Sequence, residues 1–456
     1  MNLPVAVANL VNYDPADTDI DNKIGTPGYV GITTRGVFAP NTVINDSRQR
    51  CLFRMVHSPA PLQEKMTMFW HHHFATAYSK IQGIVGTADA ARLMAAKPSE
   101  DSQGMKGQIE LLRERALGNF RDLLVEIAKD VAMLYWLDGR LNVRTNPQEN
   151  FGRELMELFT FGVENYVETD VYAAARVFTG WNVSFRGTNG TSSASYSFVY
   201  NSGNHETAAK PFSFPIYADG NKVIPARAAA AGMQDGLDLI NALAIHPETA
   251  KRLARRLWTW FVSEVDPPDA GFVSNIAQIY LDNDTEMKPV IQAVLLSPQF
   301  MDKSRYYQRY AWPVEFVVRS LKEVGRVGFS VDGAITPLLN MGQQLFEPPD
   351  VNGWELGAGW FSTGGMLARM NFAAALATNQ RFELRNVAQS AKASPEALLN
   401  FALSRLTVPD QAASERTALL DYIKAGGTWS GSDTQMLNKT GGLFHLLTGS
   451  GDYQLV

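Results

Sequence analysis

The chain has 456 residues, of which 45% are hydrophobic and 11% aromatic, a composition typical of a globular protein with a large core. The formal net charge of −5 and the lack of any basic run argue against nucleic acid as the main partner. No stretch approaches the roughly 18 consecutive apolar residues that a membrane-spanning helix needs, so we expect no transmembrane segment.

The compartment is not determined by composition. The single cysteine, Cys51, excludes an intrachain disulfide, but many exported bacterial proteins also lack disulfides. The first residues, MNLPVAVANLVNYDP, do not combine a basic region with a following apolar region, so they are not a signal peptide as written. A trimmed export signal is compatible with this sequence.

The order of the expected elements indicates a mainly α protein with a large multi-helix domain. Residues 1–45 are rich in Asp, Asn, Gly, Pro and Thr and predict an extended N-terminal arm. Residues 46–456 predict a single helical domain. Two segments interrupt it, a small β-hairpin or sheet insertion at about 182–225, where apolar and polar residues alternate, and a Gly/Trp-rich loop at 345–365.

Three consecutive histidines lie in PLQEKMTMFWHHHFAT, which predicts a helix after Pro61. On a straight helix His71 and His73 point about 200° apart and do not share one ion. If the segment became extended there, both would lie on one side, as a metal pair requires. The alternative is that His73 is a hydrogen-bonded core residue beside Trp70 and Met66. Both interpretations stay open.

The segment NPQENFGRELMELFTFGV predicts a second helix with both ends specified. Asn146 is the expected N-cap, Pro147 the first helical residue and Glu149 the capping-box residue, and the helix is expected to end at Gly162. A following helix is expected to open near Thr169 or Asp170 and to end before Gly180.

Ionisable side chains are unusually frequent on these two helices. Glu154 and Glu157, three residues apart, share a face, and Arg153 is spaced to pair with Glu157 at i+4. Arg176 comes from the second helix, so two arginines and two glutamates could meet between the helices. Such a cluster fits a site with perturbed carboxylates, and it equally fits a buried structural ion network.

Two further groups are candidates for binding. His205, Glu206 and Lys210 lie in a loop after a strand-like segment, where binding residues are common but where a solvated loop is the simpler interpretation. Asn352, Trp354 and Trp360 could form a sugar-stacking platform, and the alternative is ordinary packing of an aromatic loop. Motifs of serine hydrolases, NTPases and Rossmann proteins are missing at strand-to-helix turns.

Several segments together resemble the bacterial family called domain of unknown function 1800, and they span most of the chain: FWHHHF, NPQENFGRELMELFTFGV, FTGW, HPETAKRLARRLWTWFV, LLSPQF, PVEFVV, MGQQLFEPPDVNGW and LFHLLTGSGDYQ. The resemblance implies a largely helical, usually exported protein whose gene often neighbours that of a sulfatase-like family. It implies no established reaction. It also adds weight to His205 and Lys210, because the family tends to have His-Asp and a following Lys there. The middle histidine, His72, stands where an Asn is more usual.

Taken together, these observations lead to two hypotheses. In the first, the protein is an exported, metal-assisted hydrolase acting on an extracellular polymer, with Zn, Mn or Fe activating a water. The candidate metal ligands are His71, His73 and His205; the candidate catalytic residues are Glu154, Glu157 and Lys210; and the candidate binding residues are Arg153, Arg176, Asn352 and Trp354. In the second hypothesis the protein is a non-catalytic scaffold for a sulfatase-like partner. A periplasmic or extracellular location is expected, and a cytoplasmic one is not excluded.

Overall fold

A computed structural model describes residues 2–14, 20–408 and 411–456. The protein is mainly α, with 58% of its residues in helices, so the expected fold class is confirmed. The α-helices of the described residues are α1 Leu3–Val11, α2 Ile44–His57, α3 Pro61–His73, α4 Tyr78–Val85, α5 Thr87–Ala95, α6 Gln108–Glu114, α7 Phe120–Lys129, α8 Val131–Trp136, α9 Asn150–Glu154, α10 Glu168–Val177, α11 Met233–Ala244, α12 Pro247–Phe261, α13 Ala270–Asp282, α14 Met287–Leu296, α15 Pro298–Met301, α16 Pro313–Glu323, α17 Asp332–Asn340, α18 Thr363–Asn379, α19 Arg381–Val387, α20 Pro395–Arg405, α21 Ala413–Lys424 and α22 Asp433–Thr448.

Local sequence explains where many of these helices begin. Asn119, Asp269 and Ser394 each accept a hydrogen bond from a backbone N–H in the first turn of the helix they cap. Proline occupies the first helical position of α3 and of α12, where its missing N–H costs nothing. These starts are therefore specified by residues within the first turn of each helix.

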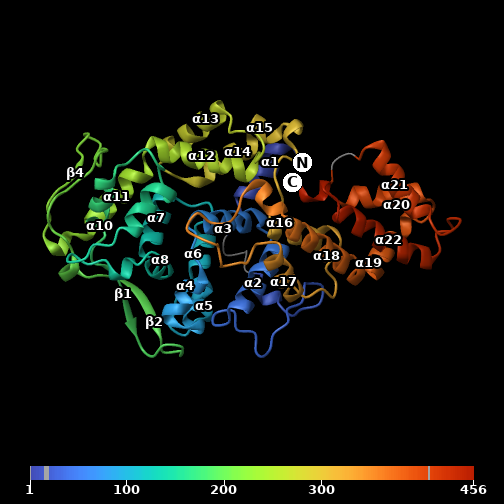
Figure 1. The fold of residues 1–456 in the computed structure, drawn as a ribbon, viewed down its shortest axis with the longest axis horizontal. Coiled ribbons are helices and arrows are strands. Elements are labelled where there is room, and N and C mark those ends of the chain that lie inside the picture. The colour runs from blue at the N-terminus through green and yellow to red at the C-terminus, as the bar shows by residue number, and fades with distance from the viewer. Residues whose placement is uncertain (1, 15–19, 409–410) are drawn as a thin grey trace.

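The expected β insertion is confirmed as two small antiparallel pairs. Strand β1 (Trp181–Arg186) pairs with β2 (Ser195–Tyr200), with Trp181 opposite Tyr200, and this hairpin projects from the body in Figure 1. Strand β3 (Lys210–Pro211) pairs with β4 (Val223–Ile224). Because β3 also contacts α10, the second pair lies beside the helix that carries Arg176.

One hydrophobic core runs through the molecule, and its centre is aromatic. The rings of Trp260 and Trp312 meet at 4.8 Å between centroids, and those of Trp312 and Trp360 at 5.5 Å. Trp354 and Trp360 are 4% and 2% exposed. The Gly/Trp-rich loop therefore packs against the body, as its aromatic content predicted.

The C-terminal helices gather at one end of an elongated molecule. Figure 1 shows α19 to α22 together at one end and the hairpin β1–β2 towards the other, with α2, α3 and α16 between them. Helix α22 contacts α18, α19, α20 and α21. No helix among the described residues is both long and apolar enough to cross a membrane.

Two expectations about local structure are wrong. The N-terminal arm is not extended throughout, because Asn2 caps α1, which contacts α3 and α14; residues 15–19 of the arm lie outside the described residues. The second expected helix begins at Asn150 and not at Asn146. The reason is that Asn146 forms an isolated β-bridge with Val143, while the side chain of Asn142 accepts the N–H of Gln148.

Candidate functional site

The histidines at the end of α3 are all buried. His71, His72 and His73 are 1%, 5% and 1% exposed, because the end of this helix is covered on every side. Helix α3 is regular up to His73, with Phe74 as its C-cap, so the extended geometry that would bring His71 and His73 together does not occur. Their side chains lie on different faces.

His73 occupies an aromatic environment, as the helical periodicity predicted. Its Nε2 lies 3.0 Å from the carbonyl oxygen of Phe159, so the ring donates its proton there. Its Nδ1 is buried without a partner among the described residues. Burial lowers the pKa of His73 well below its usual value, and the nearby charges of Arg256 and Arg252 lower it further. His73 is therefore a neutral core histidine.

His71 and His72 have different surroundings. The Nδ1 atom of His72 accepts the backbone N–H of Trp354 at 3.1 Å. The ring of His71 packs edge-on against Trp354, with 5.1 Å between centroids, and neither of its nitrogens has a partner among the described residues. Burial lowers the pKa of His71 to about 3, so this ring is neutral.

The loop after Asp350 is shaped to meet His72. Gly353 has φ +93°, and a Cβ at this position would lie 2.2 Å from Nδ1 of His72. Only glycine suits both the backbone conformation and the close approach. Trp354 is buried and Asn352 is exposed, with its N–H bound to Asp350. A buried indole offers no face to a sugar, so the predicted stacking platform of Asn352 and Trp354 is not formed.

A π-helical turn, Leu155–Phe159, follows α9. The N–H of Gly162 closes it by bonding to the carbonyl of Met156 at 2.9 Å, and Gly162 has φ +88°, so the predicted end of this helix is confirmed. Such turns are rare and frequently occur at functional sites. The widened turn changes which side chains become neighbours.

The predicted pair of Arg153 with Glu157 is wrong. Arg153 binds Glu168 at 2.5 Å and Glu149 at 3.4 Å, while Glu157 accepts a hydrogen bond from the hydroxyl of Tyr166. The physical reason is the π-helical turn between them, since the i+4 rule holds only for an uninterrupted α-helix.

Glu154 has no hydrogen bond or ion pair with any described residue, although it is partly buried. Burial raises its pKa, and the neighbouring charge of Glu157 raises it further. The two carboxylates thus differ in environment: Glu157 accepts a hydrogen bond from Tyr166, and Glu154 is unpaired and has a raised pKa.

Arg252 of α12 lies close to this turn. The Nη2 atom of Arg252 lies 3.4 Å from the carbonyl oxygen of Leu158, and its guanidinium passes beside Gly162, where a Cβ would lie 3.1 Å from Nη1. The Nε atom of Arg252 is buried without a partner in the described part of the chain. Burial lowers the pKa of Arg252, and the negative charge of Glu157 partly opposes that shift.

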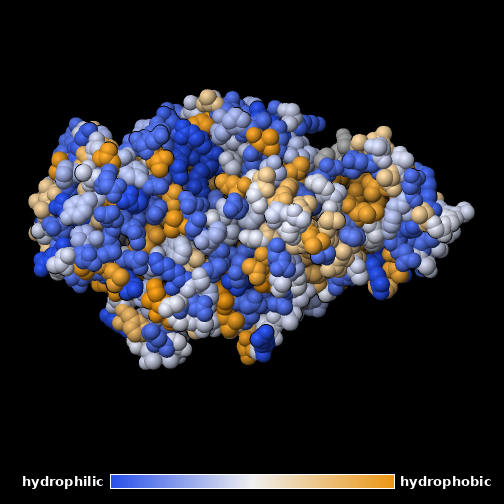
Figure 2. All heavy atoms as spheres, in the orientation of Figure 1, coloured by the Kyte–Doolittle hydropathy of each residue, from blue (hydrophilic) through white to orange (hydrophobic). Residues whose placement is uncertain are grey.

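Arg256 follows one helical turn later and is partly buried. Burial lowers its pKa to about 9, with a further contribution from the positive charge of Arg252. No described residue forms a hydrogen bond or ion pair with it. Figure 2 shows a strongly hydrophilic surface where Figure 1 places α12. Neither guanidinium group forms an ion pair with a described residue, so both positive charges lack an acidic partner in this part of the chain.

The predicted residues of the β insertion form a separate, buried network around Asp235 of α11. His205 Nε2 lies 3.2 Å from Oδ2 of Asp235, and Lys210 Nζ lies 2.6 Å from the same oxygen. Arg227 binds Oδ1 at 2.5 Å. His205 and Lys210 are 1% and 0% exposed. Burial alone would raise the pKa of Asp235, but hydrogen bonds from His205, Lys210 and Arg227 lower it.

This network corrects the roles expected of His205 and Lys210. Nδ1 of His205 donates to the carbonyl of Thr179 at 2.8 Å, and Lys210 also donates to the carbonyl of Glu206 at 2.6 Å. Both side chains are fully used in contacts that join the insertion to α11, so Lys210 is not available as a catalytic residue. Arg176 belongs here as well: it lies 3.2 Å from the carbonyl of Ala209 and does not meet Glu154 or Glu157.

The predicted metal centre is not assembled. Within residues 2–14, 20–408 and 411–456, no group of three or more His, Cys, Asp or Glu side chains is arranged to hold a metal ion. His205 is bound to Asp235, His73 to Phe159, and His71 lies against Trp354. The three proposed ligands therefore contact three different partners and do not form one site.

Some residues of this region were missed by sequence reasoning. Asp235, Arg227 and Tyr166 carry no periodic signal, because each partner lies outside the residue's own helix or in a separate segment, eight or more residues away. Arg252 and Arg256 did carry one: in HPETAKRLARRLWTWF they are spaced one turn apart on a helix whose other face is apolar. That spacing indicates a shared charged face.

The sequence model of the family described as protein of unknown function DUF1800 matches residues 15–455. The chain belongs to this family. The match covers the histidines of α3, the π-helical turn, α12 and the loop of Trp354, so the contacts described above lie within the DUF1800 region. No curated protein and no solved structure matches the chain.

Proposed function

We propose that this DUF1800 protein is a hydrolase that acts on an anionic polymer outside the cytoplasm, with its site at the π-helical turn. The observation that carries the proposal is the contrast between Glu154 and Glu157. Glu154 is partly buried and unpaired with a raised pKa, while Glu157 is oriented by Tyr166. Two carboxylates in different environments are a common basis of acid and base roles.

In this mechanism Glu154 is the general acid and Glu157 the general base. Glu157 takes a proton from a water, the water oxygen attacks the scissile centre, and Glu154 gives its proton to the leaving oxygen. Tyr166 holds Glu157 in position through its hydroxyl. Arg252 and Arg256 bind a negatively charged group of the substrate, which compensates the two unpaired guanidinium groups.

The mechanism does not use the metal-assisted route that the sequence suggested. The residues of the predicted ligand set are engaged in separate contacts. The version supported by the geometry therefore needs only the two carboxylates and the arginine pair.

The test is the release of new reducing ends from sulfated or uronic-acid polysaccharides, compared with uncharged polysaccharides. We expect Glu154→Gln and Glu157→Gln to lower kcat by about 100-fold or more, the usual contribution of a general acid or base. Arg256→Gln should mainly raise KM for the anionic substrate. The matched control is Glu149→Gln, an exposed glutamate before the same turn, which should leave activity unchanged.

The second hypothesis is a non-catalytic scaffold for a sulfatase-like partner. The observation that favours it is the structural use of His205 and Lys210, which leaves less chemistry in this region than the sequence suggested. If no polymer is cleaved and a purified sulfatase-like protein binds with 1:1 stoichiometry, the hydrolase proposal is wrong and the scaffold is supported.

A further inference from the structure

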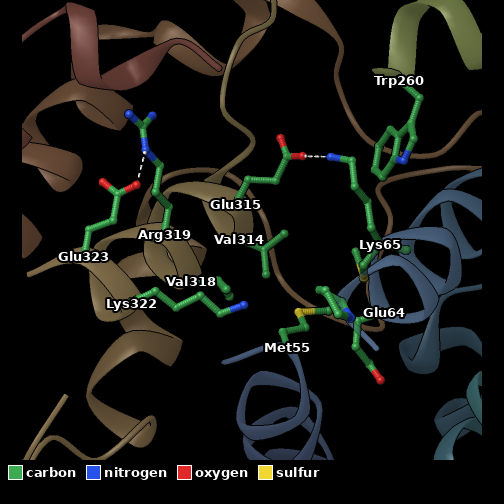
Figure 3. A pocket seen from close by; sticks show the side chains of 12 residues that line it. Met55, Glu64, Lys65, Trp260, Val314, Glu315, Val318, Arg319, Lys322 and Glu323 are labelled. Carbon is green, nitrogen blue, oxygen red and sulfur yellow. Dashed lines mark hydrogen bonds and ion pairs between the residues drawn. The ribbon is translucent and has the colours of Figure 1, made fainter. Parts of the chain in front are cut away.

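A cavity of about 300 Å³ lies in the centre of the molecule, away from the π-helical turn (Figure 3). Its walls come from α2, α3, α16 and the last turn of α12. Half of the lining residues are apolar, with two flexible methionines among them, and the main ones are Met55, Met68, Trp260, Val314 and Val318; the other half are charged. Small-molecule pockets typically have volumes of about 300–1,000 Å³ and mainly apolar walls.

Most charges around the cavity are already paired. Glu315 accepts the N–H of Trp312 at 3.1 Å and a guanidinium nitrogen of Arg309 at 3.2 Å, and it also binds Lys65. Figure 3 shows the Lys65–Glu315 pair on one side of the cavity, with Lys65 beside Trp260. The ammonium of Lys65 lies 5.0 Å from the centre of that ring. Both charges of this pair are therefore already compensated by protein contacts.

The other acidic residues are also occupied. Glu64 binds Arg113 in the buried layer behind the cavity, and Glu323 lies 3.4 Å from Nε of Arg319. Figure 3 shows the Arg319–Glu323 pair at the far edge. These contacts leave no spare carboxylate to neutralise a further positive charge.

Lys322 is the one charged residue of the cavity lining whose side chain has no hydrogen bond or ion pair with a described residue. In Figure 3 its side chain extends along the cavity towards Met55. Lys322 is exposed, so a ligand can reach this group from solution. An unpaired ammonium at the edge of an apolar cavity suits an anion with an apolar body, because the charge and the hydrocarbon each find a partner.

We propose that this cavity binds a small monocarboxylate with an apolar body. The carboxylate pairs with Lys322, and the hydrocarbon lies against Met55, Met68 and Trp260. Methionine side chains adapt to ligands of different shapes, so the cavity selects for charge and size more than for exact outline. This binding site is independent of the carboxylates of the π-helical turn.

The test is isothermal titration calorimetry of the full chain with decanoate and decyltrimethylammonium, each below its micelle concentration, and with decan-1-ol below its solubility limit. We expect one saturable decanoate site, with weaker binding of the alcohol and weaker still of the cation. Lys322→Met should weaken decanoate binding by about three- to tenfold, the range of a partly exposed ion pair, and should leave decan-1-ol unchanged. Lys322→Arg should restore the preference for decanoate.

Two further variants complete the design. Val318→Trp should fill the cavity and abolish binding of both decanoate and decan-1-ol, with circular dichroism to confirm that the variant is folded. Lys288→Met, at an exposed lysine of α14 that does not line the cavity, should bind decanoate like the wild type. The proposal is overturned if decanoate shows no saturable binding, if decan-1-ol binds as tightly as decanoate, or if Lys322→Met binds decanoate like Lys288→Met. Lys322 is exposed, so its substitution tests the proposal even if Val318→Trp does not fold.

Discussion

The backbone N–H of Trp354 donates a hydrogen bond to Nδ1 of His72 over 3.1 Å and joins two segments 282 residues apart. The ring of His72 also packs edge-on against Trp312 at 5.0 Å between centroids. Because Nδ1 accepts, the proton of the neutral ring lies on Nε2. His72 therefore anchors the Gly/Trp-rich loop to the end of α3.

This contact predicts different results for two substitutions of His72. Asn also has a side-chain acceptor, so His72→Asn should lower the free energy of unfolding only modestly. His72→Leu leaves the buried N–H of Trp354 without a partner, at a cost of about 1–3 kcal/mol. Urea unfolding of the three proteins checks the order. Equal stability of the Leu and Asn variants would contradict the anchoring role.

The carboxylates of the π-helical turn should differ in their effects on stability. The folded protein raises the pKa of Glu154 above its ordinary value of 4.5, so ionisation of this group at neutral pH opposes folding. Glu154→Gln should therefore stabilise the protein at pH 7, by less than about 1 kcal/mol because the carboxyl is only partly buried. The gain should disappear near pH 4, where Glu154 is protonated in both states.

Glu157→Gln is the matched comparison, because it alters the acceptor that Tyr166 uses and weakens the attraction to Arg252. We expect it to lower the melting temperature at pH 7. A stabilising effect of Glu157→Gln equal to that of Glu154→Gln would show that the two environments do not differ.

The network around Asp235 should be important for stability. Asp235 is 0% exposed and is bound by His205, Lys210 and Arg227. Asp235→Asn leaves buried positive charge uncompensated, and breaking such a buried pair typically costs about 3–5 kcal/mol. Asp238→Asn is the control, since Asp238 binds the same Arg227 but its side chain is 13% exposed. Guanidinium unfolding should show a much larger loss for Asp235.

Glu315 should contribute to acid stability. Burial alone would raise its pKa, but Arg309 and Lys65 lower it from 4.5 to about 2. The stabilisation is therefore complete above pH 4.5 and is lost as the pH falls towards 2, and it corresponds to about 3 kcal/mol at 1.36 kcal/mol per unit.

The variant Glu315→Gln tests this, because glutamine keeps the capping bond to Trp312 but not the charge. It should be less stable than the wild type at pH 7, and the difference should shrink as the pH falls below 4.5. Glu383→Gln, at an exposed glutamate, should show no such pH-dependent difference.

Local features of the chain were predictable from the sequence. The start of α3 at Pro61, the turn at Gly162, the alternating strands of the insertion and the burial of the Trp-rich loop all follow from near neighbours in the sequence. These features depend on backbone conformation, hydrogen bonding within one turn and side-chain hydrophobicity, which a single segment specifies by itself.

Partners between distant segments were decided only by the tertiary structure. The sequence predicted Glu154 and Glu157 on one face of a helix. In the structure Glu157 instead accepts a hydrogen bond from Tyr166 at the π-helical turn, and Glu154 is unpaired. The sequence also indicated His205 and Lys210 as candidates, but it did not predict that both side chains contact Asp235. The physical reason is that a buried charge takes its partner from whichever element packs against it, and periodicity within one helix carries no information about that element.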